Sequence, residues 1–82
     1  PVLVTIRDEA GEYSETGASA KLNGSEDTIV GYEGQVYVEN AASSNTLSVQ
    51  QSNGENCTVT FNAPATASGR TTIPDAVCRK DQ

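Results

Sequence analysis

The chain has 82 residues, of which 35% are hydrophobic, and its five basic and eleven acidic residues give a net charge of −6. A chain of this length buries roughly 60% of its unfolded surface, so it holds one thin core and no catalytic domain with a deep cleft. The acidic balance argues against nucleic acid as a partner, and no apolar run reaches the roughly 20 residues of a membrane helix, so no direct membrane insertion is expected.

Short strands account for most of the sequence. Residues 2–7 alternate Val2, Val4 and Ile6 with other side chains, which is the period of a half-buried strand. Similar alternating or β-branched runs predict strands at 18–22, 28–30, 35–38, 46–51 and 56–61. Two short apolar pieces, 71–73 and 76–78, flank Pro74, which confines that region to an edge strand or a bend.

Turn residues separate these strands. Asn53-Gly54 is the strongest hairpin signal, and Asn23-Gly24 is a second one. Residues 62–69 are predicted to form a loop, and residues 79–82 are predicted to be a tail. No segment of ten or more residues has a 3.6-residue period, so no substantial helix is expected. Strands at intervals of about 8–12 residues predict an all-β sandwich or small barrel.

The alternation also predicts the side chains of the core. They share one face of each strand and are apolar. The predicted core residues are Val4, Ile6, Ala20, Leu22, Ile29 or Val30, Val36, Val38, Leu47, Val49, Cys57, Val59 and Phe61.

The two cysteines, Cys57 and Cys78, are too far apart for a CxxC motif, and without histidine they make a poor metal site. A disulfide is the favoured interpretation, because a thin-cored domain gains about 3 kcal/mol from closing such a loop. It implies an oxidising compartment. Two buried free thiols in a cytosolic protein are the alternative.

Catalysis is not expected. The adjacent carboxylates Glu26 and Asp27 could hold calcium or act as acid and base, but neighbours in a turn point apart, and a solvated acidic face is favoured. Serine and threonine nucleophiles lack a histidine base. We therefore assign no catalytic, metal-binding or cofactor-binding residues and expect no cofactor.

Leu3, Tyr32 and Tyr37 are candidate outward-facing apolar residues, and such a patch often marks a protein partner. The alternative is that both strand faces are covered or that these residues are simply exposed.

Because a strand follows Pro1 directly, we expect residues 1–82 to be a single domain excised from a larger secreted or membrane protein.

Several segments of the chain together form a recognisable pattern. They are V-L-V-T-I-R-D-E-A-G (2–11), G-A-S-A (17–20), I-V-G-Y-E-G-Q-V-Y-V (29–38), L-S-V (47–49), and C-T-V-T-F (57–61) with a second cysteine near the terminus. In this order and spacing they resemble the C-terminal periplasmic domain of outer-membrane fimbrial ushers. The capsule-type ushers, such as that of the F1 antigen, are one option for the subfamily.

This resemblance implies a six- or seven-stranded Greek-key β-sandwich at the periplasmic face of the bacterial outer membrane. The expected partners are periplasmic chaperone–subunit complexes and the rest of the usher, namely its pore, plug and N-terminal domain. The domain would dock these complexes during fibre assembly through Leu3, Tyr32 and Tyr37, while Glu33 and Glu39 would steer a basic chaperone.

Two other functions are open. An immunoglobulin-like spacer of a bacterial surface adhesin would have the same disulfide-bonded β-fold but no docking face. A carbohydrate-binding module ranks last because the chain has only three tyrosines and one phenylalanine for stacking on sugars.

Overall fold

The computed structural model describes residues 2–63 and 71–80. In chain order the elements are β1 (Val2–Arg7), β2 (Ser19–Leu22), β3 (Glu26–Ile29), the 3-10 turn η1 (Tyr32–Gly34), β4 (Gln35–Val38), β5 (Ser44–Gln50), β6 (Asn56–Asn62), β7 (Thr71–Val77) and β8 (Arg79–Lys80). None of the described residues forms an α-helix, as the missing 3.6-residue period predicts. Accordingly, this part of the chain offers no helix able to span a membrane.

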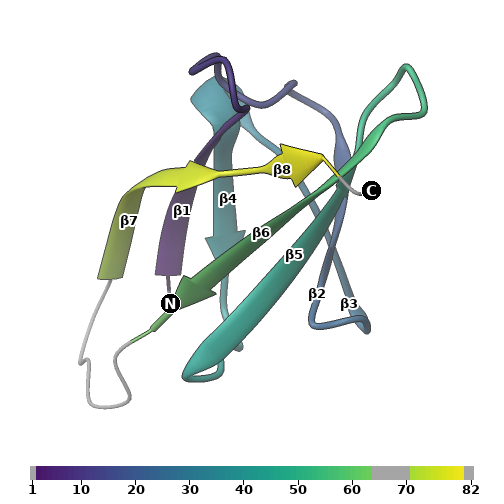
Figure 1. Ribbon diagram of the computed structural model, residues 1–82. Coiled ribbons are helices and arrows are strands. Elements are labelled where there is room, and N and C mark those ends of the chain that lie inside the picture. Colours follow the sequence, from purple (N-terminus) through teal and green to yellow (C-terminus); the bar gives the residue numbers. More distant parts are fainter. Residues whose placement is uncertain (1, 64–70, 81–82) are drawn as a thin grey trace.

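The strands form two sheets, which confirms the predicted all-β sandwich. The smaller sheet has the order β4-β1-β7 and the larger sheet the order β3-β2-β5-β6-β8. Figure 1 shows β1 and β4 running upright and β7 rising beside β1 before it bends toward β8, while β5 and β6 cross obliquely. The central strand β1 is antiparallel to β4 and parallel to β7. The described residues contain eight strands rather than six or seven, because the predicted tail includes β8.

A single core fills the space between the sheets. It follows from strict alternation, since β2 and β4 bury every second residue and β5 does so over its whole length. The buried hydrophobic residues are Val2, Val4, Ile6, Ala18, Ala20, Leu22, Val30, Val36, Val38, Leu47, Val49, Cys57, Val59, Phe61, Ala76 and Cys78. The predicted core is therefore confirmed, with Val30 rather than Ile29 as the buried member of that pair.

The edge strand β3 begins two residues earlier than predicted. The run 28–30 suggested a short β-branched strand, but β3 spans Glu26–Ile29 and pairs with β2 alone. Ile29 is 60% exposed, whereas Val30 turns inward just after the strand. Acidic residues on an exposed edge discourage pairing with other chains, which explains why polar residues open this strand.

Proline is accommodated in β7 because this strand lies at the edge of the smaller sheet. The register with β1 passes from Val4 opposite Ile73 to Ile6 opposite Ala76, so β7 carries one extra residue at this point. This bulge joins the two short pieces predicted on either side of Pro74 into one strand.

The chain end differs from the prediction, since Arg79 and Lys80 are not a free tail. They form β8 and pair with Cys57 and Thr58 of β6.

A disulfide joins Cys57 to Cys78, whose Cα atoms lie 5.4 Å apart. It confirms the predicted bond and excludes the free-thiol alternative. It ties β6 to the residue between β7 and β8 and so connects the two sheets. Of the predicted loop 62–69, Asn62 ends β6, and residues 64–69 lie outside the described part of the chain.

Candidate functional site

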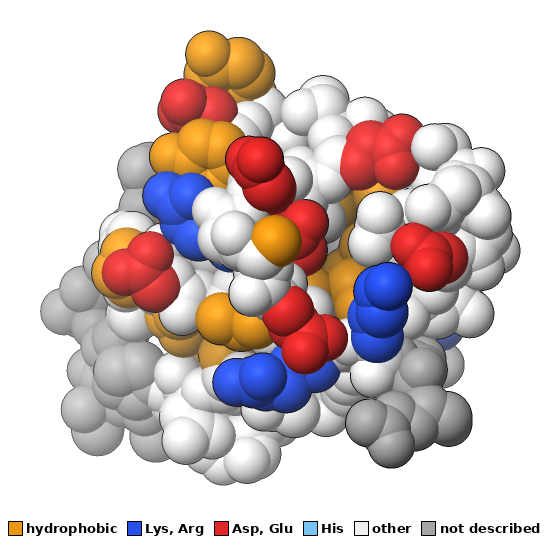
Figure 2. Space-filling model, turned by 45° about the horizontal axis from the view of Figure 1, so that its top comes forward, with side chains coloured by type: hydrophobic (Ala, Val, Ile, Leu, Met, Phe, Trp, Pro, Cys, Tyr) orange, Lys and Arg blue, Asp and Glu red, His pale blue; other side chains and the backbone are white. Residues whose placement is uncertain are grey.

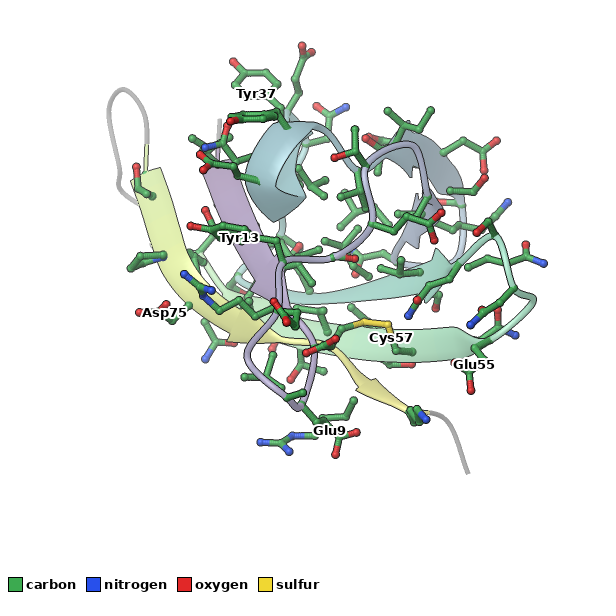
Figure 3. All side chains as sticks on the ribbon, turned by 90° about the horizontal axis from the view of Figure 1, so that it is seen from above. Glu9, Tyr13, Tyr37, Glu55, Cys57 and Asp75 are labelled. Atoms are coloured by element: carbon green, nitrogen blue, oxygen red, sulfur yellow. A yellow bond between two sulfur atoms is a disulfide. The ribbon has the colours of Figure 1, made fainter. Side chains whose placement is uncertain are left out.

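Leu3 and Tyr37 lie side by side on the outer face of the smaller sheet. The register of β1 and β4 makes them direct cross-strand partners, and Thr72 of β7 lies opposite Leu3 on its other side. Leu3 is half-buried and Tyr37 is 49% exposed. Figure 3 shows Tyr37 on the side of the molecule away from Cys57 and β6. The predicted outward direction of both side chains is thus correct, and we call them the Leu3–Tyr37 pair.

A second aromatic group was missed by the sequence reasoning. Tyr13 is 43% exposed and its residue forms an isolated bridge with Arg7 at the far end of β1. The Arg7 guanidinium lies 4.2 Å from the centre of the Tyr13 ring and 3.7 Å from an oxygen of Asp75. Val77, which is 38% exposed, lies opposite Arg7 on β7. The row of Tyr13, Arg7 and Val77 therefore extends the outer face beyond the Leu3–Tyr37 pair.

We define the outer face of the smaller sheet as three rows of residues on β4, β1 and β7, the last of which also includes Tyr13 from outside the strands. The first row is Tyr37, Leu3 and Thr72, the second is Gln35 and Thr5, and the third is Tyr13, Arg7 and Val77. An aromatic side chain thus stands at each end of this face, with the Arg7 guanidinium beside Tyr13, while its middle row is polar.

Tyr32 and Glu33 stand at a turn just before β4. Tyr32 is 76% exposed, and Glu33 has a left-handed backbone with φ of 52°. Gly34 fixes the turn against β1, because a Cβ at this position would collide with the carbonyl oxygen of Ile6. Tyr32 and Glu33 precede β4, whereas Tyr37 lies near its far end. They therefore lie at the other end of β4 from the Leu3–Tyr37 pair, next to Ile6 of β1, and are held there by a fixed backbone.

Glu39 follows β4 at a shallow hollow of about 190 Å³ between β3 and β4. The lining residues are Leu22, Glu26, Asp27, Thr28, Tyr37, Val38, Glu39 and Asn40. Asp27 is paired with Lys21 at 3.1 Å, and Glu26 accepts a hydrogen bond of 3.2 Å from the Asn40 amide. Glu39 shares this hollow with Tyr37, so a carboxylate borders the aromatic side chain.

Acidic side chains surround this part of the surface. Neither Glu33 nor Glu39 forms an ion pair within residues 2–63 and 71–80. Figure 2 shows acidic side chains dispersed among small hydrophobic patches on one face of the molecule. Across the described part of the chain, no group of three or more Cys, Asp or Glu side chains is arranged to hold a metal ion. The arrangement suits contact with a polypeptide better than coordination chemistry.

Comparison with known proteins defines the class. The family model described as "PapC C-terminal domain" matches residues 3–65, which is most of the chain. The chain therefore belongs to the family of PapC-type usher C-terminal domains, as its motifs predict. This family is a non-catalytic module of outer-membrane ushers, which act in chaperone–usher assembly of fimbriae.

Two solved structures share the fold. The C-terminal domain of the PapC usher has 25% sequence identity and a TM-score of 0.72, with 95% of this chain and 96% of that chain covered. The C-terminal domain of the Caf1A usher has 16% identity and a TM-score of 0.83, with 99% and 98% covered. In Caf1A, conserved hydrophobic clusters on the surface of this domain are important for F1 antigen assembly. A search of curated proteins finds no match.

Proposed function

We propose that residues 1–82 form the C-terminal domain of a longer usher and lie at the periplasmic face of the bacterial outer membrane. There the domain docks chaperone–subunit complexes during fibre assembly, and the outer face of the smaller sheet makes the contact. The family match supports the usher over the spacer of a surface adhesin.

The observation that carries this proposal is the pairing of Leu3 with Tyr37 on an outward face. An exposed tyrosine beside an aliphatic residue is the kind of contact enriched in protein interfaces, because it buries apolar area while its hydroxyl stays hydrated. The hydrophobic surface clusters that matter for F1 antigen assembly in Caf1A support a similar role for an apolar face here.

Tyr32 is the third contact of the proposed interface. Its 76% exposure leaves the ring open to a partner, and the turn that presents it is fixed by Gly34. A side chain on an already ordered backbone loses little conformational freedom on binding, so it contributes affinity at low entropic cost.

Glu33 and Glu39 give the interface its charge. Both are exposed, and the chain has a net charge of −6, so a partner with a basic surface approaches faster than a neutral one. The chaperone of the complex is the component to which we assign this basic surface. The rest of the usher (pore, plug and N-terminal domain) supplies the remaining contacts that hold the domain in the assembly.

The direct test is binding of the domain to a purified chaperone–subunit complex. We expect measurable association at micromolar concentration, and a loss of affinity of at least tenfold on Tyr37→Asp, since burying an unpaired carboxylate in an interface costs more than about 1.4 kcal/mol. Leu3→Asp should weaken binding similarly if circular dichroism shows that the variant folds.

Ile29→Asp is the matched control. Ile29 is also an exposed apolar residue, at 60%, but it lies on β3 at the edge of the larger sheet. The proposal predicts unchanged affinity for this variant. Absence of binding at high micromolar concentration would refute the docking role, and equal losses for Ile29→Asp and Tyr37→Asp would refute the assignment to this face.

A further inference from the structure

Two Asn–Gly pairs occupy hairpin turns, and their side chains are held in different ways. Asn23-Gly24 joins β2 to β3, and Asn53-Gly54 joins β5 to β6. Both glycines have positive φ, +77° and +86°, with open space where a Cβ would stand. Asn–Gly is the pair most prone to ring closure, since glycine has no side chain to block its backbone nitrogen from the asparagine amide carbon.

Asn23 is tied to the neighbouring strand. Its Oδ1 accepts a hydrogen bond of 2.9 Å from the backbone N–H of Thr46, and its Nδ2 donates one of 3.2 Å to Oδ1 of Asn45. Asn45 is itself buried, with 4% of its surface exposed. The Asn23 amide therefore cannot turn toward the nitrogen of Gly24 unless these bonds to β5 break.

Among the described residues, Asn53 has only local partners. Its Nδ2 donates to Oε1 of Glu55 at 3.0 Å, and its Oδ1 accepts from the backbone N–H of Glu55 at 2.9 Å. The turn is closed by Gly54 N–H donating to the carbonyl of Gln51 at 3.0 Å. All of these bonds lie within one exposed turn, so a local opening of that turn frees the Asn53 amide without disturbing the core.

We propose that Asn53 is a site of spontaneous chemical modification in the folded protein. When the turn opens, the Gly54 backbone nitrogen loses its proton and bonds to Cγ of Asn53. The bond from Cγ to the side-chain nitrogen breaks, and ammonia leaves with the proton it needs from solvent. Water then opens the five-membered ring at either carbonyl, which gives aspartate or isoaspartate at position 53.

The conversion changes the end of the β5–β6 hairpin. The new carboxylate adds one negative charge and replaces the amide donor that faces Glu55. Glu55 also forms an ion pair of 3.5 Å with Lys80 of β8, which joins the turn to the chain end. The new carboxylate at position 53 repels the Glu55 carboxylate of this ion pair. The isoaspartate product additionally lengthens the backbone between the two strands.

The test is incubation of the folded, disulfide-bonded protein at mildly alkaline pH, followed by peptide mapping with mass spectrometry and an isoaspartyl methyltransferase assay. Position 53 should convert several-fold faster than position 23. In the reduced and denatured chain the two rates should become similar, because the bonds that protect Asn23 are then absent.

Two variants sharpen the result. Gly54→Ala should slow conversion at position 53 and leave position 23 unchanged. Asn45→Ala removes the acceptor of the Asn23 amide and should speed conversion at position 23 alone. Equal rates at the two positions in the folded wild type, or faster conversion at Asn23, would overturn the proposal whether or not either variant folds.

Discussion

At residue 34 the backbone leaves no room for a side chain. Gly34 has a φ of +70°, and a Cβ would collide with the carbonyl oxygen of Ile6. We expect Gly34→Ala to lower the free energy of unfolding by about 3 kcal/mol or more, from left-handed strain and overpacking together. Urea denaturation of the variant measures this loss.

Gly24 provides the control for this prediction. Its φ is +77°, but nothing lies within 4 Å of the added atom. Gly24→Ala should therefore cost only the backbone strain, about 1–2 kcal/mol. Equal losses at positions 24 and 34 would show that close approach to β1 does not constrain the Tyr32–Gly34 turn.

The carboxyl of Glu15 gives the fold a pH dependence. Hydrogen bonds from Ser52, from its hydroxyl first and its backbone N–H second, lower the pKa of Glu15 in the folded state. A lowered folded-state pKa stabilises the fold above the ordinary carboxyl pKa, and this contribution is lost as the pH falls through the folded value. Glu15→Gln should thus destabilise the protein more at neutral pH than at strongly acidic pH.

Thermal unfolding of this variant across the acidic range measures the effect. Glu12→Gln is the control, because the Glu12 carboxylate makes no hydrogen bond or ion pair among the described residues. A Glu15→Gln effect that is independent of pH would contradict the assigned role of Ser52.

Single residues differ in how well alternation predicts them. Leu3 and Tyr37 were predicted to face outward, because each lies one position from a buried valine in a regular strand. Tyr13 was not found, because it lies outside any strand and its position depends on Arg7, a contact that no local period records. The left-handed backbone of Glu33 was not predicted either, because it accompanies the close packing of Gly34 against β1, which no sequence period indicates.

At the scale of the elements, the disulfide ties the junction between β7 and β8 to β6 of the larger sheet. It closes a sequence separation of 21 residues between Cys57 and Cys78. We expect the double variant Cys57→Ala and Cys78→Ala to lose about 3 kcal/mol, chiefly because the unfolded chain gains conformational freedom. Denaturation with and without reductant measures it: wild type should respond to reductant and the variant should not.

An unchanged stability of this double variant would contradict that account. It would mean that the remaining contacts of the chain end suffice, among them the pairing of β7 with β1 and of β8 with β6, and the bond of 2.7 Å from the Cys78 N–H to the carbonyl of Arg7.

The long strands were predictable and the chain end was not. β5 and β6 each have seven residues of near-perfect alternation and an Asn–Gly turn between them, so period and turn chemistry agree. β8 has only two residues, too few to show any period, and it pairs with β6 directly after the disulfide-bonded Cys78. The bulge at Pro74 likewise follows from the edge position of β7, which sequence alone leaves open.

At the scale of the whole molecule, polar and apolar side chains are distributed unevenly over the described surface. The outward positions of β5 and β6 are mostly neutral and polar, as Thr46, Ser48 and Thr60 illustrate, whereas the outer face of the smaller sheet carries aromatic residues. This asymmetry is the reason for assigning the docking role to the smaller sheet.

Charge at the proposed interface should act mainly on the rate of association. Glu33→Gln and Glu39→Gln should each slow binding to the chaperone–subunit complex by a few-fold at low salt, with little effect on dissociation. Stopped-flow or surface-based kinetics at two salt concentrations measures this. Glu55→Gln removes the same charge from the β5–β6 turn and serves as the control; an equal slowing there would indicate net charge rather than local steering.

NMR chemical-shift mapping of the labelled domain, on addition of the chaperone–subunit complex, tests the central claim most directly. The docking proposal predicts the largest shifts at Leu3 in β1, at Tyr37 in β4 and at Tyr32 in the turn before it. Large shifts along the outward residues of β5 and β6, with β1 and β4 unaffected, would contradict it.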